Sequence, residues 1–278
     1  MPKPLIEKQM KEMSEPVSPV FDGDLLFNEA NWADAIQSQT RLFSIDELNR
    51  VSEGLRNDFY HGHTNDRKMP EIRPSKELAS LLAPYQDRTI GYDLPCLISP
   101  RKPSCGRIVL CAQDPLRKKD DAPGQVTVGT FFGIDNERFR HSYRHYPIIW
   151  QLVRSCVEAG YEVWLTDAYK IFAGKNVVAR DKALDDLCRE VLQDEVARVS
   201  PTHILALGNT AAHMLEKAGF TDRFSRAVHP TAHQTTKPYW HLKDATQAYE
   251  DNRAGRQLAK VHYYCRQIFG TDEPTRPV

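Results

Sequence analysis

The sequence predicts an α/β protein: a three-layer α/β/α fold around a central, mostly parallel four-stranded sheet, preceded by a helical N-terminal segment. Two observations lead to this prediction. From about residue 105 onward, short apolar runs alternate with longer stretches of helical periodicity, which is the pattern of parallel strands joined by crossover helices. Before about residue 90 the chain is polar and interrupted by prolines, so we expect that part to be an extension that packs on the core.

Each expected element has a local signal. In the N-terminal segment, Ser44 and Glu47 form a capping box with Phe43 and Leu48 as its hydrophobic staple, and Ser75 begins a second short helix. Strands are expected at 107–112, 162–166, 203–207 and 226–228, and helices at roughly 144–158, 181–198, 209–218 and 245–268.

These patterns divide the chain into three parts. Residues 1–90 form the helical or irregular extension, residues 91–270 form one α/β domain, and residues 271–278 form a flexible tail. A domain of this length can bury an adequate hydrophobic core.

Composition and charge place few limits on function. The chain is 41% hydrophobic and 27% charged, and 37 Lys plus Arg balance 37 Asp plus Glu, so the net charge neither indicates nor excludes a nucleic-acid partner. No run is suited to a signal peptide or a membrane span, which favours a cytoplasmic protein with no membrane partner. The six cysteines include no Cys-x-x-Cys pair, and we expect reduced thiols without an iron–sulfur cluster.

Chemically useful residues follow each expected strand. The first strand runs into Gln113 and Asp114, the second into Asp167, the third into Gly208 and the fourth into His229. Ligands of open parallel sheets bind at the carboxyl ends of the strands. We therefore expect two carboxylates and an imidazole to converge on one crevice.

Two motifs at these strand ends resemble those of the uracil-DNA glycosylase superfamily. Ala112-Gln-Asp-Pro-Leu116 is similar to the family's Gly-Gln-Asp-Pro-Tyr, and His229-Pro-Thr-Ala-His233 is similar to its His-Pro-Ser-Pro-Leu. The resemblance covers roughly residues 105–235, with both motifs in the family's order. It implies a monomeric, monofunctional DNA glycosylase that hydrolyses the N-glycosidic bond of a flipped-out pyrimidine and leaves an abasic site.

The resemblance also implies roles that suit the residue types. Asp114 would stabilise the oxocarbenium-like sugar and orient a water. His229 would donate a hydrogen bond to the departing base, together with a backbone amide near Gln113. Phe131 would stack on the extruded base. By themselves, Asp114 could merely cap a turn and Phe131 could be a core residue.

Three positions depart from the family's pattern. The asparagine that reads uracil is Asp167 here, and the tyrosine that crowds the C5 edge of the base is Leu116. A protonated carboxyl matches the N4 donor and N3 acceptor of cytosine, and leucine relaxes the exclusion of C5 substituents. The family's wedge leucine is His233, which either fills the gap in the duplex or indicates a preference for single strands.

The departures favour a cytosine with a bulky C5 modification as the substrate. Such bases occur in the DNA of some bacterial viruses, so the enzyme would serve in defence against phage. Asp167 could instead cap the segment that follows its strand. Further DNA contacts are expected from residues beside the two motifs: Arg117, Lys118, Lys119, Thr231 and His233.

We expect neither a metal nor another cofactor. His229 and His233 are four residues apart, but Pro230 argues against a helix between them and no third ligand is evident. Three other functions stay open: a uracil-DNA glycosylase of base excision repair, a catalytically inactive protein that binds modified DNA, and a hydrolase of free nucleosides. The sequence leaves the excised base, the strand preference and the oligomeric state undecided.

Overall fold

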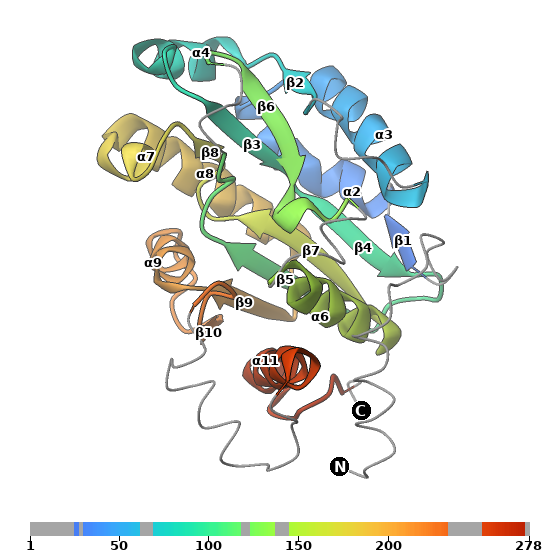
Figure 1. Ribbon diagram of the computed structural model, residues 1–278. Coiled ribbons are helices and arrows are strands. Elements are labelled where there is room, and N and C mark those ends of the chain that lie inside the picture. Colours follow the sequence, from blue (N-terminus) through green and yellow to red (C-terminus); the bar gives the residue numbers. More distant parts are fainter. Residues whose placement is uncertain are drawn as a thin grey trace.

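The computed structural model describes residues 25–27, 30–61, 69–117, 123–136, 145–232 and 252–275. These residues form an α/β fold with two mixed β-sheets and helices packed around them (Figure 1). The predicted fold class is therefore confirmed at this level. None of the described helices is long and apolar enough to cross a membrane.

The larger sheet contains the four predicted strands. Its strand order is β1-β4-β7-β5-β9-β10, and the last four strands run parallel. These four are β7 (Tyr161–Asp167), β5 (Gly106–Ala112), β9 (His203–Leu207) and β10 (Ser225–Ala227). Their carboxyl ends lie at one edge of the sheet, as the strand-end prediction required.

The same sheet has two further strands that the sequence did not predict. β4 (Cys96–Pro100) pairs antiparallel with β7, and β1 (Leu25–Phe27) pairs antiparallel with β4. The sheet is therefore six-stranded and mixed, not four-stranded. The apolar run that forms β4 is bounded by Pro95 and Pro100, and prolines in and beside a run argue against a strand.

A second sheet was also missed. It has the order β2-β6-β3-β8, with β3 and β6 parallel and the outer strands antiparallel. Its strands are β2 (Glu71–Ile72), β6 (Val126–Thr130), β3 (Ile90–Leu94) and β8 (Ile171–Phe172). Figure 1 shows β3 and β6 running together beside the larger sheet.

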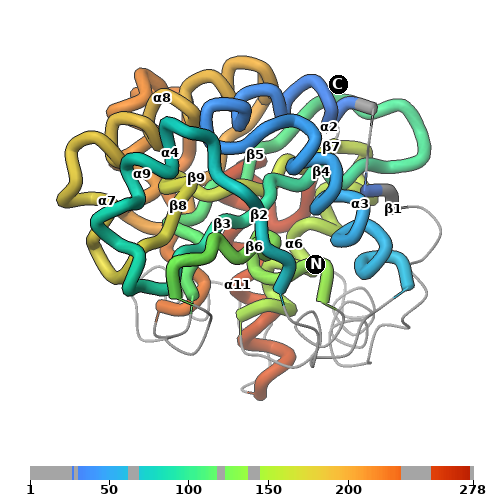
Figure 2. Tube along the Cα trace, turned by 90° about the horizontal axis from the view of Figure 1, so that it is seen from above, coloured from blue at the N-terminus to red at the C-terminus, as the bar shows by residue number. Residues whose placement is uncertain are grey.

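Helices pack against the parallel strands. α6 (Tyr146–Glu158) packs against β7 and α11 (Arg253–Phe269) against β9 and β10. α9 (Asn209–Lys217) packs against β9 and β5, and α8 (Lys182–Val199), preceded by α7 (Val177–Arg180), packs against α9. Figure 2 shows α2 and α8 on one side of β5 and β7, and α6 and α11 on the other. The predicted helix at 245–268 begins at residue 253 in the described part of the chain.

Strand β5 shows why the parallel strands could be predicted from the sequence. Val109 and Cys111 belong to one hydrophobic core, whereas Ile108 and Leu110 belong to another. Successive side chains of a strand point to opposite faces, so both faces of this strand are buried. A strand buried on both faces reads as a continuous apolar run.

The N-terminal segment is built into this core. Its helices are α2 (Ala30–Ala35), a 3-10 helix (Ile36–Arg41), α3 (Ile45–His61), α4 (Lys76–Leu82) and a 3-10 turn (Ala83–Tyr85). Trp32 and Leu42 share a core with Trp164 of β7. The serine caps are present, because Ser44 Oγ accepts from the Glu47 amide at 3.3 Å and Ser75 Oγ accepts from the Leu78 amide at 3.1 Å. The Glu47 carboxylate accepts from the Arg73 amide at 3.1 Å, so only the serine half of the predicted capping box is seen.

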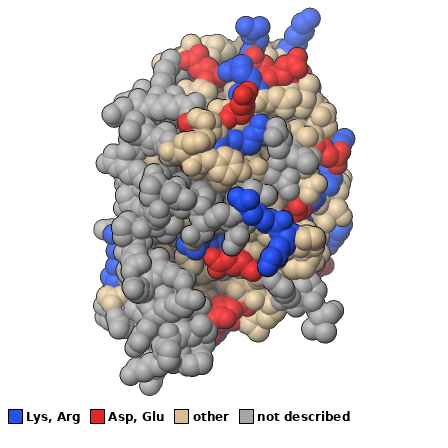
Figure 3. Space-filling model, turned by 90° about the vertical axis from the view of Figure 1, so that its right-hand side faces the viewer, with Lys and Arg blue, Asp and Glu red and all other residues tan. Residues whose placement is uncertain are grey.

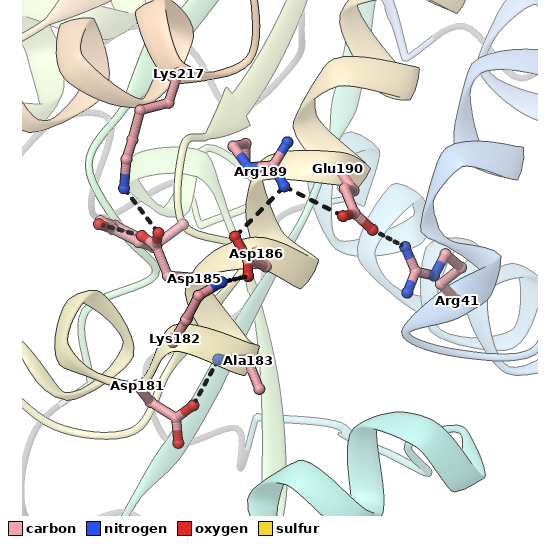
Figure 4. A network of polar contacts seen from close by, with 10 residues as sticks. Arg41, Asp181, Lys182, Ala183, Asp185, Asp186, Arg189, Glu190 and Lys217 are labelled. Atoms are coloured by element: carbon pink, nitrogen blue, oxygen red, sulfur yellow. Dashed lines mark hydrogen bonds and ion pairs between the residues drawn. The ribbon is translucent and has the colours of Figure 1, made fainter.

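An exposed network of ion pairs joins α8 to the N-terminal segment (Figure 4). Arg189 pairs with Asp186 and Glu190, and Glu190 pairs with Arg41. Arg41 also pairs with Glu77 at 2.5 Å, but its side chain is 45% exposed. Pairs of this kind contribute roughly 0–1 kcal/mol each, so the shared hydrophobic core is the main connection between the two parts.

Residues 271–275 follow α11 and contact the domain. Arg266 of α11 forms an ion pair with Asp272, and the Tyr161 hydroxyl donates to the Thr275 carbonyl at 2.8 Å. The flexibility of the tail from residue 271 stays a prediction, and residues 276–278 lie outside the described part.

A buried ion pair joins the segment after β7 to α8. Lys170 and Glu195 contact each other with side chains 1% and 0% exposed. Lys170 also donates to Thr166 Oγ1 at 2.7 Å, and Glu195 Oε1 accepts from Trp164 and from Thr166, both at 2.8 Å. Each buried charge is thus matched by an opposite charge and hydrogen bonds, as burial of charge requires.

We expect Lys170→Met to lower the free energy of unfolding by about 3–5 kcal/mol, because it leaves Glu195 buried without its partner. Urea denaturation measures the change. Lys182→Met is the matched control: Lys182 is exposed and pairs with Asp186 at 2.5 Å, so its loss should change stability little. Equal effects of the two substitutions would contradict a structural role for the buried pair.

Candidate active site

The loop after β5 places Asp114 beside the end of β7. The carbonyls of Ala112 and Gln113 accept the amides of Ala168 and Tyr169, both at 2.9 Å, which fastens the two strand ends together. Asp114 Oδ2 accepts from the Gln113 side-chain amide at 2.8 Å. Burial raises the pKa of Asp114, and the Gln113 hydrogen bond and the charge of Arg117 oppose that shift.

Asp167, the last residue of β7, carries an unsatisfied buried oxygen. The residue is 5% exposed, and its Oδ2 has no hydrogen-bond partner. Burial raises the pKa of Asp167 well above its ordinary value, and the charges of Asp93 and Asp114 raise it further. Burial and the neighbouring acids therefore favour the protonated, neutral form of this carboxyl. Oδ2 accepts no backbone amide, so this oxygen does not cap the segment that follows β7.

His229 follows β10 and has a defined tautomer. Its Nδ1 lies 3.3 Å from the backbone nitrogen of Thr231, which can only donate, and 2.7 Å from Thr231 Oγ1. Nδ1 is thus an acceptor, and the proton of the neutral ring is on Nε2. Burial lowers the pKa of His229 to about 4, and His145 contributes to the shift. The side chain is a neutral hydrogen-bond donor at physiological pH.

Helix α11 holds the loop that carries His229. The Tyr263 hydroxyl accepts from the Val228 amide at 3.1 Å, and the Tyr264 hydroxyl donates to the Val228 carbonyl at 2.8 Å. Lys260 Nζ donates to two carbonyls further along the loop at 3.2 and 3.4 Å. Sequence reasoning missed these three residues, because an amphipathic helix gives no sign of which distant loop it contacts.

Gly208, at the end of β9, allows close approach of this loop. It has a φ of +98°, and a Cβ at this position would lie 3.4 Å from His229 Cβ. This conformation favours glycine. The close approach to His229 also confirms the prediction that Gly208 lies at the same sheet edge as His229.

The two phenylalanines after β6 differ in their surroundings. Phe131 is 1% exposed and packs in the core, so it has no surface open to a base, contrary to the prediction. Phe132, in the 3-10 turn Phe131–Gly133, is half-buried with its ring centroid 5.8 Å from that of His229. Its φ of 49° is rare for a non-glycine residue and tends to occur at functional sites. Phe132 is therefore an aromatic neighbour of the imidazole.

Arg117 does not lie on the surface. Its side chain is 5% exposed and pairs with Asp93 at 2.8 Å. It also donates to the Tyr92 carbonyl at 2.6 Å and to Thr127 Oγ1 at 3.1 Å. A guanidinium occupied in this way is not available to a phosphate, so the predicted DNA contact is wrong for Arg117.

The remaining predicted residues differ in exposure. Leu116 is 72% exposed, whereas Asp167 is buried. Thr231 is exposed and contacts His229, whereas Lys118, Lys119 and His233 lie outside the described residues. On the face shown in Figure 3, acidic and basic side chains are interspersed, so the described residues form no continuous basic surface in this view.

Two further acids lie near the predicted ones. Asp93 comes from β3, and burial together with the charges of Asp135 and Asp114 raises its pKa, whereas Arg117 lowers it. Asp135 accepts a hydrogen bond from Thr130. Both acids belong to the second sheet and its following turn, which the sequence did not reveal.

No protein-family model matches this chain, and no curated protein matches it significantly. Among the described residues, no group of three or more His, Cys, Asp and Glu side chains is arranged to hold a metal ion.

Proposed function

We propose that this protein is a DNA glycosylase that hydrolyses the N-glycosidic bond of a flipped-out pyrimidine, a C5-modified cytosine, and leaves an abasic site. The observation that carries the proposal is the set of groups at one edge of the parallel strands. These are Asp114, a neutral His229 and a buried Asp167 with an unpartnered oxygen. The four parallel strands would be the central layer of the three-layer fold of the family that the motifs resemble.

The chemistry needs two of these groups at the reacting bond. As the bond from C1′ to the base nitrogen breaks, its electron pair leaves with the base and positive charge develops on the sugar. The Asp114 carboxylate would stabilise that charge, orient the attacking water and take its proton. The Nε2–H of His229 would donate to the base oxygen on which negative charge develops.

Asp167 supports cytosine as the base. A protonated carboxyl offers one O–H donor and one carbonyl acceptor. The cytosine edge offers an N3 acceptor beside an N4 donor. The two sets are complementary when the oxygen that faces N3 carries the proton, whereas uracil, with a donor at N3 and an acceptor at O4, requires the proton on the other oxygen. The unpartnered Oδ2 of Asp167 is a buried polar atom that such a base would satisfy.

Two neighbouring residues support a modified base. Leu116 is 72% exposed, and it stands where the family that the motifs resemble has the tyrosine that crowds the C5 edge. Phe132 lies next to His229 with its ring 5.8 Å away, and it replaces Phe131 as the proposed stacking residue. An enzyme with this substrate would act against viral DNA that carries modified cytosine.

We expect Asp167→Asn to shift base preference toward uracil. Loss of the matched pair should reduce release of modified cytosine roughly 10–100-fold, while uracil release becomes measurable. Asp135→Asn is the matched control, because that buried carboxyl is hydrogen-bonded to Thr130 and should leave the preference unchanged. Competition between the two DNAs, with mass spectrometry of the released bases, measures the ratio. An unaltered ratio in the Asp167 variant would exclude its role in reading the base.

A further inference from the structure

The side chain of Arg117 donates hydrogen bonds to the loop that carries Asp114. Its Nη1 donates to the carbonyls of Pro115 and Leu116 at 3.1 and 3.3 Å. The Leu116 amide donates back to the Asp114 carbonyl at 2.9 Å. The loop from Asp114 to Arg117 is thus held in one tight turn.

The far end of the same side chain is fixed in the second sheet. Arg117 Nη2 donates to Asp93 Oδ1 at 2.8 Å and to the Tyr92 carbonyl at 2.6 Å, both on β3. It also donates to the Thr127 carbonyl of β6 at 3.1 Å. One guanidinium therefore connects the loop after β5 to two strands of the other sheet.

Two glycines leave the space that this connection occupies. A Cβ at Gly91 would lie 2.5 Å from Arg117 Cγ and 2.6 Å from the Pro115 carbonyl. A Cβ at Gly129 would lie 2.8 Å from Asp93 Oδ1. Non-bonded atoms do not approach so closely, so a side chain at Gly91 would displace the arginine or the loop.

The charge of Arg117 also reaches the reacting group. The charge of Asp114 raises the pKa values of three neighbours: Asp93 of β3, Asp167 of β7 and Tyr169 in the turn after β7. Burial raises the pKa of Asp114, and Arg117 acts in the opposite direction. Among these neighbours Arg117 is the cation, so it opposes both burial and the surrounding acids.

We propose that Arg117 is a positioning residue for the glycosylase reaction, which fixes the Asp114 loop to the second sheet and stabilises the Asp114 carboxylate in its ionised form. The kinetic part of this inference rests on the proposed function. The anchoring of the loop can be measured without turnover.

The test compares Arg117→Met and Arg117→Lys with the same substitutions at Arg107. Arg107 is a matched control at the opposite end of β5, where it donates to Glu162 at 2.7 and 2.9 Å and to the Val199 carbonyl at 2.8 Å. Substitutions at Arg107 should lower stability but leave kcat and its pH profile unchanged, because that arginine is remote from the reacting groups.

We expect Arg117→Met to lower kcat about 100-fold, the loss typical of a misplaced catalytic group. KM for DNA and its salt dependence should change little, because Arg117 does not reach a phosphate. The acid limb of the kcat/KM profile should move to higher pH, because the carboxylate of Asp114 loses its cation. Arg117→Lys should restore the acid limb but not the full kcat, since lysine lacks the planar fork.

Asp93→Asn should shift the acid limb in the opposite direction, and the substitution changes the shape of the side chain very little. It removes an anion that faces Asp114, so the acid limb should move to lower pH. This variant keeps the test decisive if Arg117→Met does not fold. An acid limb that does not move in Asp93→Asn, or one that is displaced to higher pH in Arg117→Lys as far as in Arg117→Met, would overturn the electrostatic part.

Hydrogen exchange separates this inference from the proposed function. The Leu116 amide should exchange faster in Arg117→Met than in the wild type, whether or not any DNA is cleaved. If the wild type releases no base, the proposed function fails, and exchange still decides whether Arg117 anchors the loop. Unchanged exchange with unchanged kcat would overturn the inference, and so would a raised KM with a weaker salt dependence, which would make Arg117 a DNA contact.

Discussion

Replacing Asp114 by asparagine should slow base release by about 10²–10⁴-fold, the contribution of a positioned catalytic acid or base. The amide keeps the shape of the side chain but has no charge with which to stabilise the sugar or accept a proton from water. Binding of DNA should be almost unaffected, because the lost interaction forms as the bond breaks. Single-turnover kinetics at saturating enzyme measure the chemical step directly.

Asp181→Asn is the control for this substitution. Asp181 caps α8 by accepting the amides of Ala183 and Leu184 at 3.0 and 3.2 Å, and asparagine caps helices equally well. Its single-turnover rate should equal that of the wild type. A rate for Asp114→Asn within a few-fold of the wild-type rate would remove Asp114 from the reaction.

Replacing His229 by alanine should lower the rate by about 10²–10³-fold, the usual cost of removing one donor that stabilises a developing anion. His203→Ala is the control, because His203 is also a partly buried histidine but begins β9 at the opposite edge of the sheet. Equal rates for the two variants would contradict the donor role of His229.

The pH dependence follows from the lowered pKa of His229. The ring titrates at about 4 in the folded protein against 6.5 ordinarily, so it stays neutral above pH 6.5 in both folded and unfolded chains. Its contribution to stability is present above pH 6.5 and is lost as the pH falls toward 4, because the unfolded chain then binds the proton more readily. We expect denaturation midpoints of the wild type to fall more steeply than those of His229→Ala across this window.

The sequence predicted the parallel strands because both faces of β5, β7 and β9 are buried, which makes them read as apolar runs. The second sheet gave no such signal. Gly91 and Asp93 interrupt the apolar pattern of β3, and β2 and β8 are two residues long. Their pairing is set by contacts between distant parts of the chain, which no local pattern records.

The candidate site, like the fold, could be predicted only in part. The positions of Asp114, Asp167 and His229 followed from strand ends, a rule of topology that needs no side-chain detail. The direction of a side chain did not follow from its neighbours in sequence. Arg117 turns inward although it adjoins a charged run, and Phe131 and Phe132 are consecutive yet point into different surroundings.

The most direct test of the proposed function is a base-release assay on three DNAs that contain uracil, cytosine or C5-modified cytosine, with Asp114→Ala as the inactive control. Abasic sites would be scored by alkali cleavage and the released bases identified by mass spectrometry. We expect release from the modified cytosine alone, and none by the control. Release of uracil would instead indicate a repair enzyme, and binding of DNA without release of any base would contradict the glycosylase proposal.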